Sequence, residues 1–245
     1  MDEVTGQVLD LVSAEPVVVG DPGSTAGWLQ RLCRAAARDL PAWGVGVSLL
    51  TEAGDRRRVA ASGAVTLAVE ELQFTLGEGP CQRAHATGVP VLVPDLSSTS
   101  TDGQWVTYAP AAARLGVGAV FAFPLTMGPA RLGALDVYRE RAGELSSVAL
   151  AHAAAFAAAA TQQLLATAAA AGEDEEQVED LLADQTETTA EIHQAQGMVM
   201  LQGSLSGDDA LARMRAEAFL TDTRLVEVAH AILTRELALG DGEEW

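Results

Sequence analysis

The sequence contains no lysine, only two cysteines and few aromatic residues. All 15 basic side chains are arginine, whereas 34 side chains are acidic, so the formal net charge is −19. Because nucleic-acid binding usually depends on a basic surface, the charge of the whole chain argues against a polyanionic partner, and it also disfavours anionic membranes. Cys33 and Cys81 provide no disulfide framework and fit a reducing cytoplasm.

Other absences exclude whole classes of protein. The first residues, Met-Asp-Glu-Val, lack the basic and apolar regions of a signal peptide, so we expect a cytoplasmic protein. The histidines stand without metal-ligand spacing, and no phosphate-binding glycine loop of the Walker or Rossmann type occurs, so we expect no metal, no cofactor and no enzyme activity. The Ala-rich stretch Ser146–Ala171 contains a histidine and two glutamines, which favours a packed helix over a membrane span.

The chain is 245 residues long and 49% apolar, enough for two modest globular domains. Its first part alternates helix and strand patterns, with a hairpin signal at Met127–Ala130 between the last two strands. We predict an α+β fold with an antiparallel sheet flanked by helices. The expected helices are 24–40, 65–74, 105–115 and 146–171, the expected strands are 45–51, 57–62, 89–93, 117–126 and 131–139, and 96–103 is an expected loop.

A composition break separates this part from the C-terminal residues. Glu173–Glu176, followed by Glu179 and Asp180, form an acidic run typical of a linker. Residues at three- and four-residue spacing favour a dimeric coiled coil, with a single solvated helix as the alternative: Val178, Leu181, Gln185, Thr188, Ile192, Ala195 and Val199. Two further helix patterns follow, the first opening on the capping-box-like Ser206–Asp209, so we expect an all-α three-helix bundle.

Four segments of the first part, taken in order, resemble a GAF domain. They are Leu76–Cys81 (LGEGPC), Pro90–Leu96 (PVLVPDL), Phe121–Leu125 (FAFPL) and Leu132–Tyr138 (LGALDVY). The resemblance covers roughly residues 24–170 and implies a central antiparallel sheet flanked by helices. It also implies a sensor or dimerisation module, with an unidentified small molecule as one candidate ligand.

Three segments of the C-terminal part resemble an ANTAR domain. They are Ile192–Met200 (IHQAQGMVM), Asp209–Ala218 (DALARMRAEA) and Arg224–Ala229 (RLVEVA). The resemblance implies a three-helix domain that binds paired hairpin loops in nascent transcripts and prevents transcription termination. It thereby implies RNA and a second copy of the chain as partners. ANTAR domains often have lysine where this chain has Gln196, so an amide replaces a positive charge there.

The candidate RNA-contacting residues are His193, Gln196, Gly197, Arg213, Arg215 and Arg224. A guanidinium can pair with a phosphate or stack on an unpaired base, but the arginines could equally form surface salt bridges. A glycine inside a helix costs about 1 kcal/mol relative to alanine, which indicates close approach of RNA or packing against a neighbouring helix. Cys81, at the expected start of a helix, could be a reactive thiol or a small packed residue.

The predicted order is an N-terminal extension (1–22), a GAF sensor domain (23–171), an acidic helical linker or coiled coil (172–187), an ANTAR domain (188–240) and a tail (241–245). The predicted function is dimeric, RNA-binding transcription antitermination. The alternative is a small-molecule or redox sensor that acts through dimerisation and protein contacts without RNA, because residues 187–239 carry eight acidic side chains against four arginines. A sulfoxide reductase for free methionine is a third reading, which would need more than one cysteine near the domain's pocket.

Overall fold

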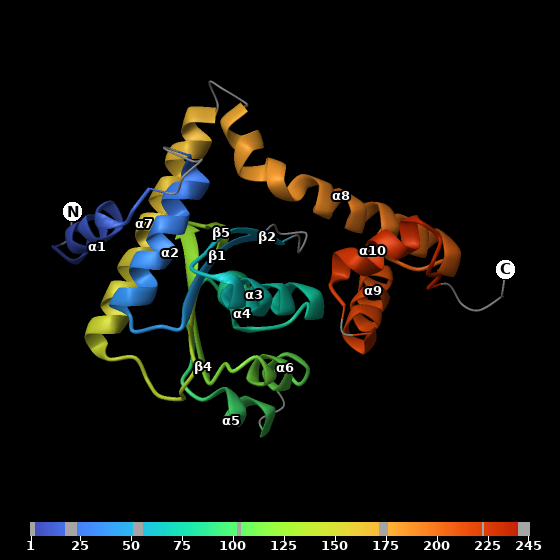
Figure 1. Ribbon diagram of the computed structural model, residues 1–245, viewed down its shortest axis with the longest axis horizontal. Coiled ribbons are helices and arrows are strands. Elements are labelled where there is room, and N and C mark those ends of the chain that lie inside the picture. The colour runs from blue at the N-terminus through green and yellow to red at the C-terminus, as the bar shows by residue number, and fades with distance from the viewer. Residues whose placement is uncertain are drawn as a thin grey trace. The chain divides into compact units, whose positions relative to one another are not determined.

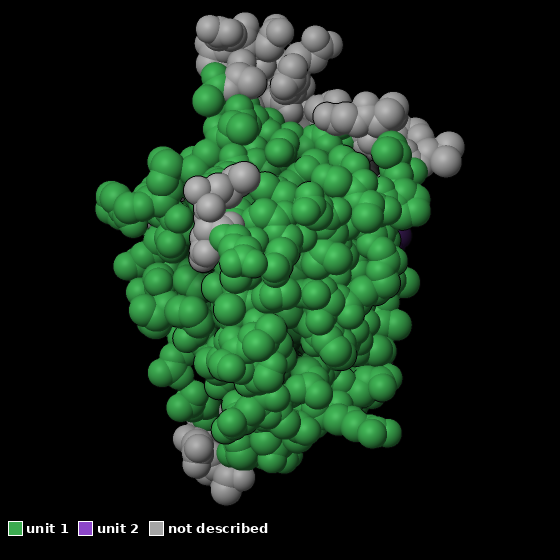
Figure 2. Space-filling view, turned by 90° about the vertical axis from the view of Figure 1, so that its left-hand side faces the viewer, with its two compact units in different colours: residues 1–73, 78–181 green, residues 74–77, 182–245 purple. Residues whose placement is uncertain are grey.

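The computed structural model describes residues 3–17, 24–50, 56–101, 104–171, 176–221 and 223–239. The chain divides into two compact units: unit 1 comprises residues 1–73 and 78–181, and unit 2 comprises residues 74–77 and 182–245. Figure 1 labels the helices and strands, and Figure 2 colours the two units separately and shows the surface of unit 1. Each unit is described by itself.

Unit 1 is built on a five-stranded sheet in the order β2-β1-β5-β4-β3, and every neighbouring pair is antiparallel. The strands are β1 (Gly44–Leu50), β2 (Arg56–Ala61), β3 (Val91–Val93), β4 (Ala119–Met127) and β5 (Ala130–Arg139). Gly128, with φ of 57°, opens the two-residue turn between β4 and β5, where only glycine adopts the required backbone without strain. The antiparallel sheet expected from the strand patterns is confirmed.

Helices cover both faces of this sheet (Figure 1). One face packs against α1 (Glu3–Ala14), α2 (Thr25–Asp39) and α7 (Ser147–Ala171), and the other lies under α3 (Ala64–Leu76) and α4 (Pro80–Thr87). Two short helices, α5 (Leu96–Thr101) and α6 (Tyr108–Arg114), follow β3. Because successive side chains of a strand point to opposite faces, Leu135 and Val137 enter the apolar core below α2 and α7, whereas Asp136 and Tyr138 point toward α3.

Helix α7 is the one described segment that is long and apolar enough to cross a membrane, judged by length and composition alone. Its inward residues include Ala153, Phe156 and Ala160, which are fully buried in the core of unit 1. The Ser146 hydroxyl accepts a hydrogen bond from the Ala149 amide at 3.1 Å and so caps the helix. The helix therefore packs as a core helix of unit 1, as its polar residues predicted.

The structure differs from the sequence predictions at two places in unit 1. The predicted loop 96–103 begins as a helix, because the Asp95 carboxylate accepts hydrogen bonds from the Ser97 amide at 2.9 Å and the Ser97 hydroxyl at 2.6 Å. The predicted N-terminal extension contains α1, whose Val8 and Val12 are buried in the same core as α2 and α7. Pro110 lies in the first turn of α6, where its missing N–H costs no intrahelical bond.

Unit 2 contains most of α8 (Glu176–Gly203), α9 (Gly207–Thr221) and α10 (Leu225–Leu233), together with the end of α3 from residue 74. One apolar core joins α8, α9 and α10, made of Ile192, Ala195, Val199, Ala210, Met214, Ala218, Leu225, Val228, Ala229 and Ile232. Ser206 caps the start of α9: its hydroxyl accepts from the Asp209 amide at 3.2 Å and donates to the Asp209 carboxylate at 2.6 Å.

The predicted coiled-coil seam is wrong in its C-terminal half. Ile192, Ala195 and Val199 are buried in the core of the bundle, where they pack against α9 and α10, so they are not available to a second helix. The side chains of the earlier seam positions, Val178 to Thr188, lie outside the described residues. The backbone of α8 runs as one helix through the predicted boundary at residue 188.

The turn after α8 carries backbone strain that a glycine would relieve. Ser204 has φ of 47°, and the Leu205 amide bonds back to the Met200 carbonyl at 3.1 Å, as in a helix C-cap where glycine is preferred. We expect Ser204→Gly to stabilise unit 2 by about 1 kcal/mol. Hydrogen exchange of the full chain should show slower exchange in α8–α10. The matched change Ala212→Gly, on the exposed side of α9, should have the opposite effect, and equal exchange in both variants would contradict the strain.

Candidate functional site

The outward side of α8 is open along two turns. His193, Gly197, Met200 and Leu201 follow one another at helical spacing and lie opposite the buried Ile192, Ala195 and Val199. Nothing lies within 4 Å of a side-chain carbon built on Gly197, and Leu201 is 85% exposed. We call these four residues the outer face of α8. Gly197 therefore does not serve close helix packing within the described bundle.

Two of the predicted RNA-contacting residues form hydrogen bonds within the bundle. The side-chain amide of Gln196 donates to the Gly207 carbonyl at 2.8 Å and so joins α8 to the start of α9. The Arg213 guanidinium donates to the Leu239 carbonyl at 3.1 Å and so ties α9 to the segment after α10. Gln196 thus supplies an interhelical hydrogen bond, a role that the sequence alone did not reveal.

The arginines of α9 and α10 do not form one patch. Arg213 and Arg215 flank the buried Met214, so at 100° per residue they project to opposite sides of α9. Arg224 is exposed at the N-cap of α10, where its guanidinium pairs with Glu227 at 2.9 Å and its amide donates to the same carboxylate at 2.9 Å. Hydrogen bonds from the Arg224 backbone and side chain lower the pKa of Glu227, so the Arg224 charge is locally balanced at neutral pH.

Of the six candidates, only His193 and Gly197 share the outer face of α8. The neighbouring Met200, 36% exposed, and Leu201, 85% exposed, are apolar side chains on this face that lie outside the bundle core. Their outward position follows from the packing of Ile192, Ala195 and Val199 against α9 and α10, which selects one side of α8 as the core.

Under α3, unit 1 contains a buried network of polar side chains. Both oxygens of the Glu70 carboxylate accept hydrogen bonds, one from Ser48 and one from the Tyr138 hydroxyl, each at 2.7 Å. The Gln73 amide nitrogen donates to the Tyr138 oxygen at 2.8 Å and to Asp136 at 3.4 Å. Gln73, Ser48 and Asp136 have no exposed surface, and Glu70 is 1% exposed. This network occupies the sheet face below α3 with the protein's own side chains.

Close approach of α3 to the sheet depends on glycine in β1. A side-chain carbon on Gly46 would stand 2.5 Å from the Glu70 carboxylate oxygen, and one on Gly44 would overlap Thr66. The backbone of Gly79, just before α4, similarly lies against the Gln73 side chain, whose carbonyl oxygen accepts from the Cys81 amide at 3.0 Å. These contacts fix α3 and α4 on the polar face of the sheet.

The two cysteines lie on opposite faces of the sheet and form no disulfide. Cys33 is in the apolar core below α2, where burial raises the pKa of its thiol far above the ordinary value. Cys81 has no exposed surface and packs with Leu50 and Ala134. Of the two alternatives for Cys81, a reactive thiol or a small packed residue, its burial favours the packed residue. Within the described part of the chain, no group of three His, Cys, Asp or Glu side chains could hold a metal.

Burial of both thiols predicts slow alkylation. At neutral pH the native protein should react with iodoacetamide at under a hundredth of the rate of the urea-unfolded protein, because the thiolate is the nucleophile and neither sulfur reaches solvent. Mass spectrometry of the alkylated peptides measures both sites separately. Rapid labelling of native Cys81 would contradict the packed reading and revive a redox role.

Comparison with known proteins supports both parts of the chain. Residues 24–165 match the GAF domain family and residues 180–233 match the ANTAR domain family. No curated protein matches the chain.

Solved structures share the fold of the GAF part. The GAF domain of a phosphoenolpyruvate-protein phosphotransferase from Coxiella burnetii is 16% identical over 69% of this chain and 95% of that chain, with a TM-score of 0.52. The corresponding GAF domain from Acinetobacter is 13% identical over 69% of this chain and 96% of that chain, with a TM-score of 0.50. At these identities the similarity shows the fold alone. The chain therefore belongs to the GAF domain family and carries an ANTAR domain behind its GAF domain.

Proposed function

We propose that this protein is a cytoplasmic transcription antitermination regulator. In this proposal unit 2 binds paired hairpin loops in RNA, the GAF domain responds to a signal, and two copies of the chain act together. The observation that carries the proposal is the match of residues 180–233 to the ANTAR family, on three helices that share one core. RNA binding is the activity that this family implies.

The outer face of α8 is the surface that best fits RNA in this bundle. Gly197 exposes helix backbone there without any neighbour, so a sugar-phosphate chain or a splayed base could approach more closely than any side chain would allow. His193, one turn earlier, offers an exposed ring that can stack on an unpaired base. Arg215 is half-buried on α9, where burial lowers the pKa of its guanidinium, and Gln196, Arg213 and Arg224 already bond within the bundle.

A two-hairpin transcript leader tests the proposal directly. The full chain should shift this RNA in a gel at low salt, and a leader with both loop sequences scrambled but both stems kept should bind at least tenfold more weakly, because sequence is read in unpaired loops. His193→Ala should weaken binding, whereas Gln162→Ala, on the exposed side of α7 in unit 1, should leave it unchanged. Absence of any shift at low salt would overturn the proposal.

The shortage of cations predicts a shallow salt dependence. Binding that releases counterions from about three phosphates gives a slope of about −2 for log K against log salt on single-stranded RNA. Gel shifts or fluorescence anisotropy at four salt concentrations measure this slope. A slope steeper than about −5 would mean that many more cations contact RNA than residues 187–239, with their four arginines, contain.

One observation favours a second function, in which the protein acts through protein contacts without binding RNA. The outer face of α8 carries exposed Met200 and Leu201 in an acidic region, which suits a protein surface as well as an RNA. In this alternative the GAF domain signals through dimerisation and protein contacts alone. RNA affinity that is unaffected by combining Arg213→Ala with Arg215→Ala would favour the alternative, and a loss of tenfold or more would favour RNA.

A further inference from the structure

A groove of about 390 Å³ opens at the outer edge of the sheet in unit 1. Its floor is the edge strand β3 with the residues before it, and its walls come from α4, from the start of α5 and from Gln104–Trp105. Val89 and Leu92 are exposed apolar side chains in this lining. None of the buried polar residues under α3 takes part, so this groove is distinct from the network of Glu70 and Tyr138.

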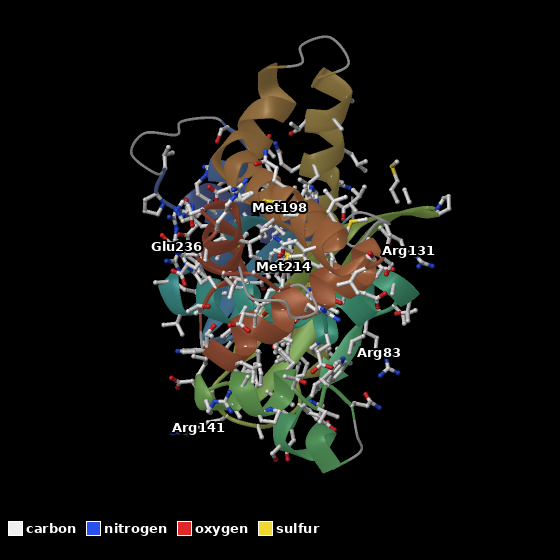
Figure 3. The ribbon with its side chains drawn as sticks, turned by 90° about the vertical axis from the view of Figure 1, so that its right-hand side faces the viewer. Arg83, Arg131, Arg141, Met198, Met214 and Glu236 are labelled. Atoms are coloured by element: carbon white, nitrogen blue, oxygen red, sulfur yellow. The ribbon has the colours of Figure 1, made fainter. Side chains whose placement is uncertain are left out.

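One wall of the groove contains Arg83, whose guanidinium is oriented by two neighbouring side chains. The Arg83 guanidinium lies 5.9 Å from the centre of the Trp105 ring and donates to the Gln104 side-chain oxygen at 2.7 Å. Arg83 is exposed, and Figure 3 shows it standing out from its helix. A guanidinium that rests on an aromatic ring and makes one hydrogen bond still has N–H donors left to bind a carboxylate. Because the side chain is already oriented, it loses less conformational entropy on binding than a freely rotating arginine would.

Trp105 is held in a strained backbone conformation. Its φ is 48°, in the left-handed region that a bulky residue rarely adopts. The segment after it is fixed from the other side, because one Glu78 carboxylate oxygen accepts from the Thr107 amide at 2.8 Å and the Tyr108 amide at 2.7 Å. Strain that the surroundings maintain is concentrated at ligand-binding sites, which makes this wall a built feature of the fold.

The lining of the groove also includes an acidic residue, Asp95. Hydrogen bonds from the side chain and backbone of Ser97 lower the pKa of Asp95, so its carboxylate is charged at neutral pH. The Asp95 carboxylate would repel the second carboxylate of a dianionic ligand. A ligand with a single carboxylate and an apolar body avoids this repulsion. The apolar lining of Val89, Leu92 and the Trp105 ring suits such a body.

We propose that this groove binds a small organic monocarboxylate with an apolar or aromatic body, with Arg83 pairing its carboxylate and Trp105 and Leu92 contacting its body. The inference rests on the proposed sensing role of the GAF domain and names the class of signal that the domain receives. A volume of about 390 Å³ lies in the range of small-molecule sites.

Phenylacetate is the probe, and calorimetry on the full chain is the measurement. Phenylacetate should bind, 2-phenylethanol and phenethylamine should bind at least tenfold more weakly, and the dianion phenylmalonate should bind more weakly than phenylacetate. Arg83→Ala and the milder Arg83→Gln should each weaken phenylacetate at least tenfold, the loss expected for a charge-assisted hydrogen bond. Asp95→Asn, which keeps a capping oxygen for α5, should reduce the difference in affinity between phenylmalonate and phenylacetate.

The matched control is Arg141→Ala, an exposed arginine of unit 1 whose side chain lies well away from Arg83 in Figure 3. It should bind phenylacetate as the parent does. Equal affinity for 2-phenylethanol and phenylacetate, an equal loss in Arg141→Ala and Arg83→Ala, or no binding at millimolar phenylacetate would each overturn the inference. RNA shifts on the same samples separate the two proposals: a shift without phenylacetate binding rejects this groove alone, and phenylacetate binding without a shift rejects antitermination alone.

Discussion

Replacing Gly197 by leucine is expected to abolish RNA binding while stabilising the helix that carries it. A side chain at this position meets nothing within 4 Å of its first carbon, and leucine is favoured over glycine inside a helix by about 0.8 kcal/mol. The same side chain would fill the gap through which RNA reaches the α8 backbone. We therefore expect the dissociation constant for a two-hairpin leader to rise at least a hundredfold, with slower hydrogen exchange in α8.

If Gly197→Leu loses RNA binding while its helix becomes more stable, the loss is due to a blocked RNA contact and not to unfolding. Ala216→Leu, on the exposed side of α9, introduces the same bulk and should change RNA affinity less than threefold. Sedimentation of both variants reports on the alternative in which a second chain packs on the outer face of α8. Unchanged RNA affinity in Gly197→Leu, with a loss of dimer, would contradict the RNA contact and assign this face to protein association.

Replacing Tyr138 by phenylalanine is expected to destabilise unit 1 by about 3 kcal/mol. The change removes the donor to one Glu70 oxygen and the acceptor of the Gln73 amide, and it leaves a buried carboxylate oxygen without that bond. Leaving a buried polar group unsatisfied costs more than the net gain of forming its bond. Urea unfolding followed by tryptophan fluorescence reads out unit 1, which contains Trp28 and Trp43.

Two further variants test whether the polar residues act as one network. In a double-mutant cycle, Tyr138→Phe combined with Glu70→Gln should destabilise less than the sum of the two single changes, because the partners share one bond. Val148→Ala, at an exposed position of α7, should stay within about 0.5 kcal/mol of the parent. Strict additivity in the cycle would show that Glu70 and Tyr138 are not energetically coupled.

Much of the fold was predictable because the decisive signals were local. The turn at Gly128 and Pro129 specifies a hairpin through the backbone that those two residues prefer. Ser146 and Ser206 cap the helices that follow them through hydrogen bonds to amides three residues away. The loop predicted at residues 96–103 was wrong because the capping role of Asp95, directly before the Ser/Thr-rich segment, was overlooked.

The structural roles of the candidate site residues were not predictable from the sequence. Gln196, Arg213 and Arg224, predicted RNA contacts, also bond to Gly207, Leu239 and Glu227. Gln196 and Arg213 reach across turns and between helices, which no local pattern reports. The groove beside β3 was missed for the same reason, since Arg83 and Trp105 belong to different segments that only the folded unit brings together.

By itself the sequence determined most of the helices and strands and their order, the antiparallel hairpin and the two-family organisation, because turns, caps and hydrophobic period act over a few residues. Only the tertiary structure decided which side of each element faces inward. It turned Ile192, Ala195 and Val199 into a bundle core instead of a dimer seam and left Gly197 open to approach. The reason is physical: a three- and four-residue repeat offers an apolar stripe, and the partner that buries it is chosen by packing between segments far apart in the chain.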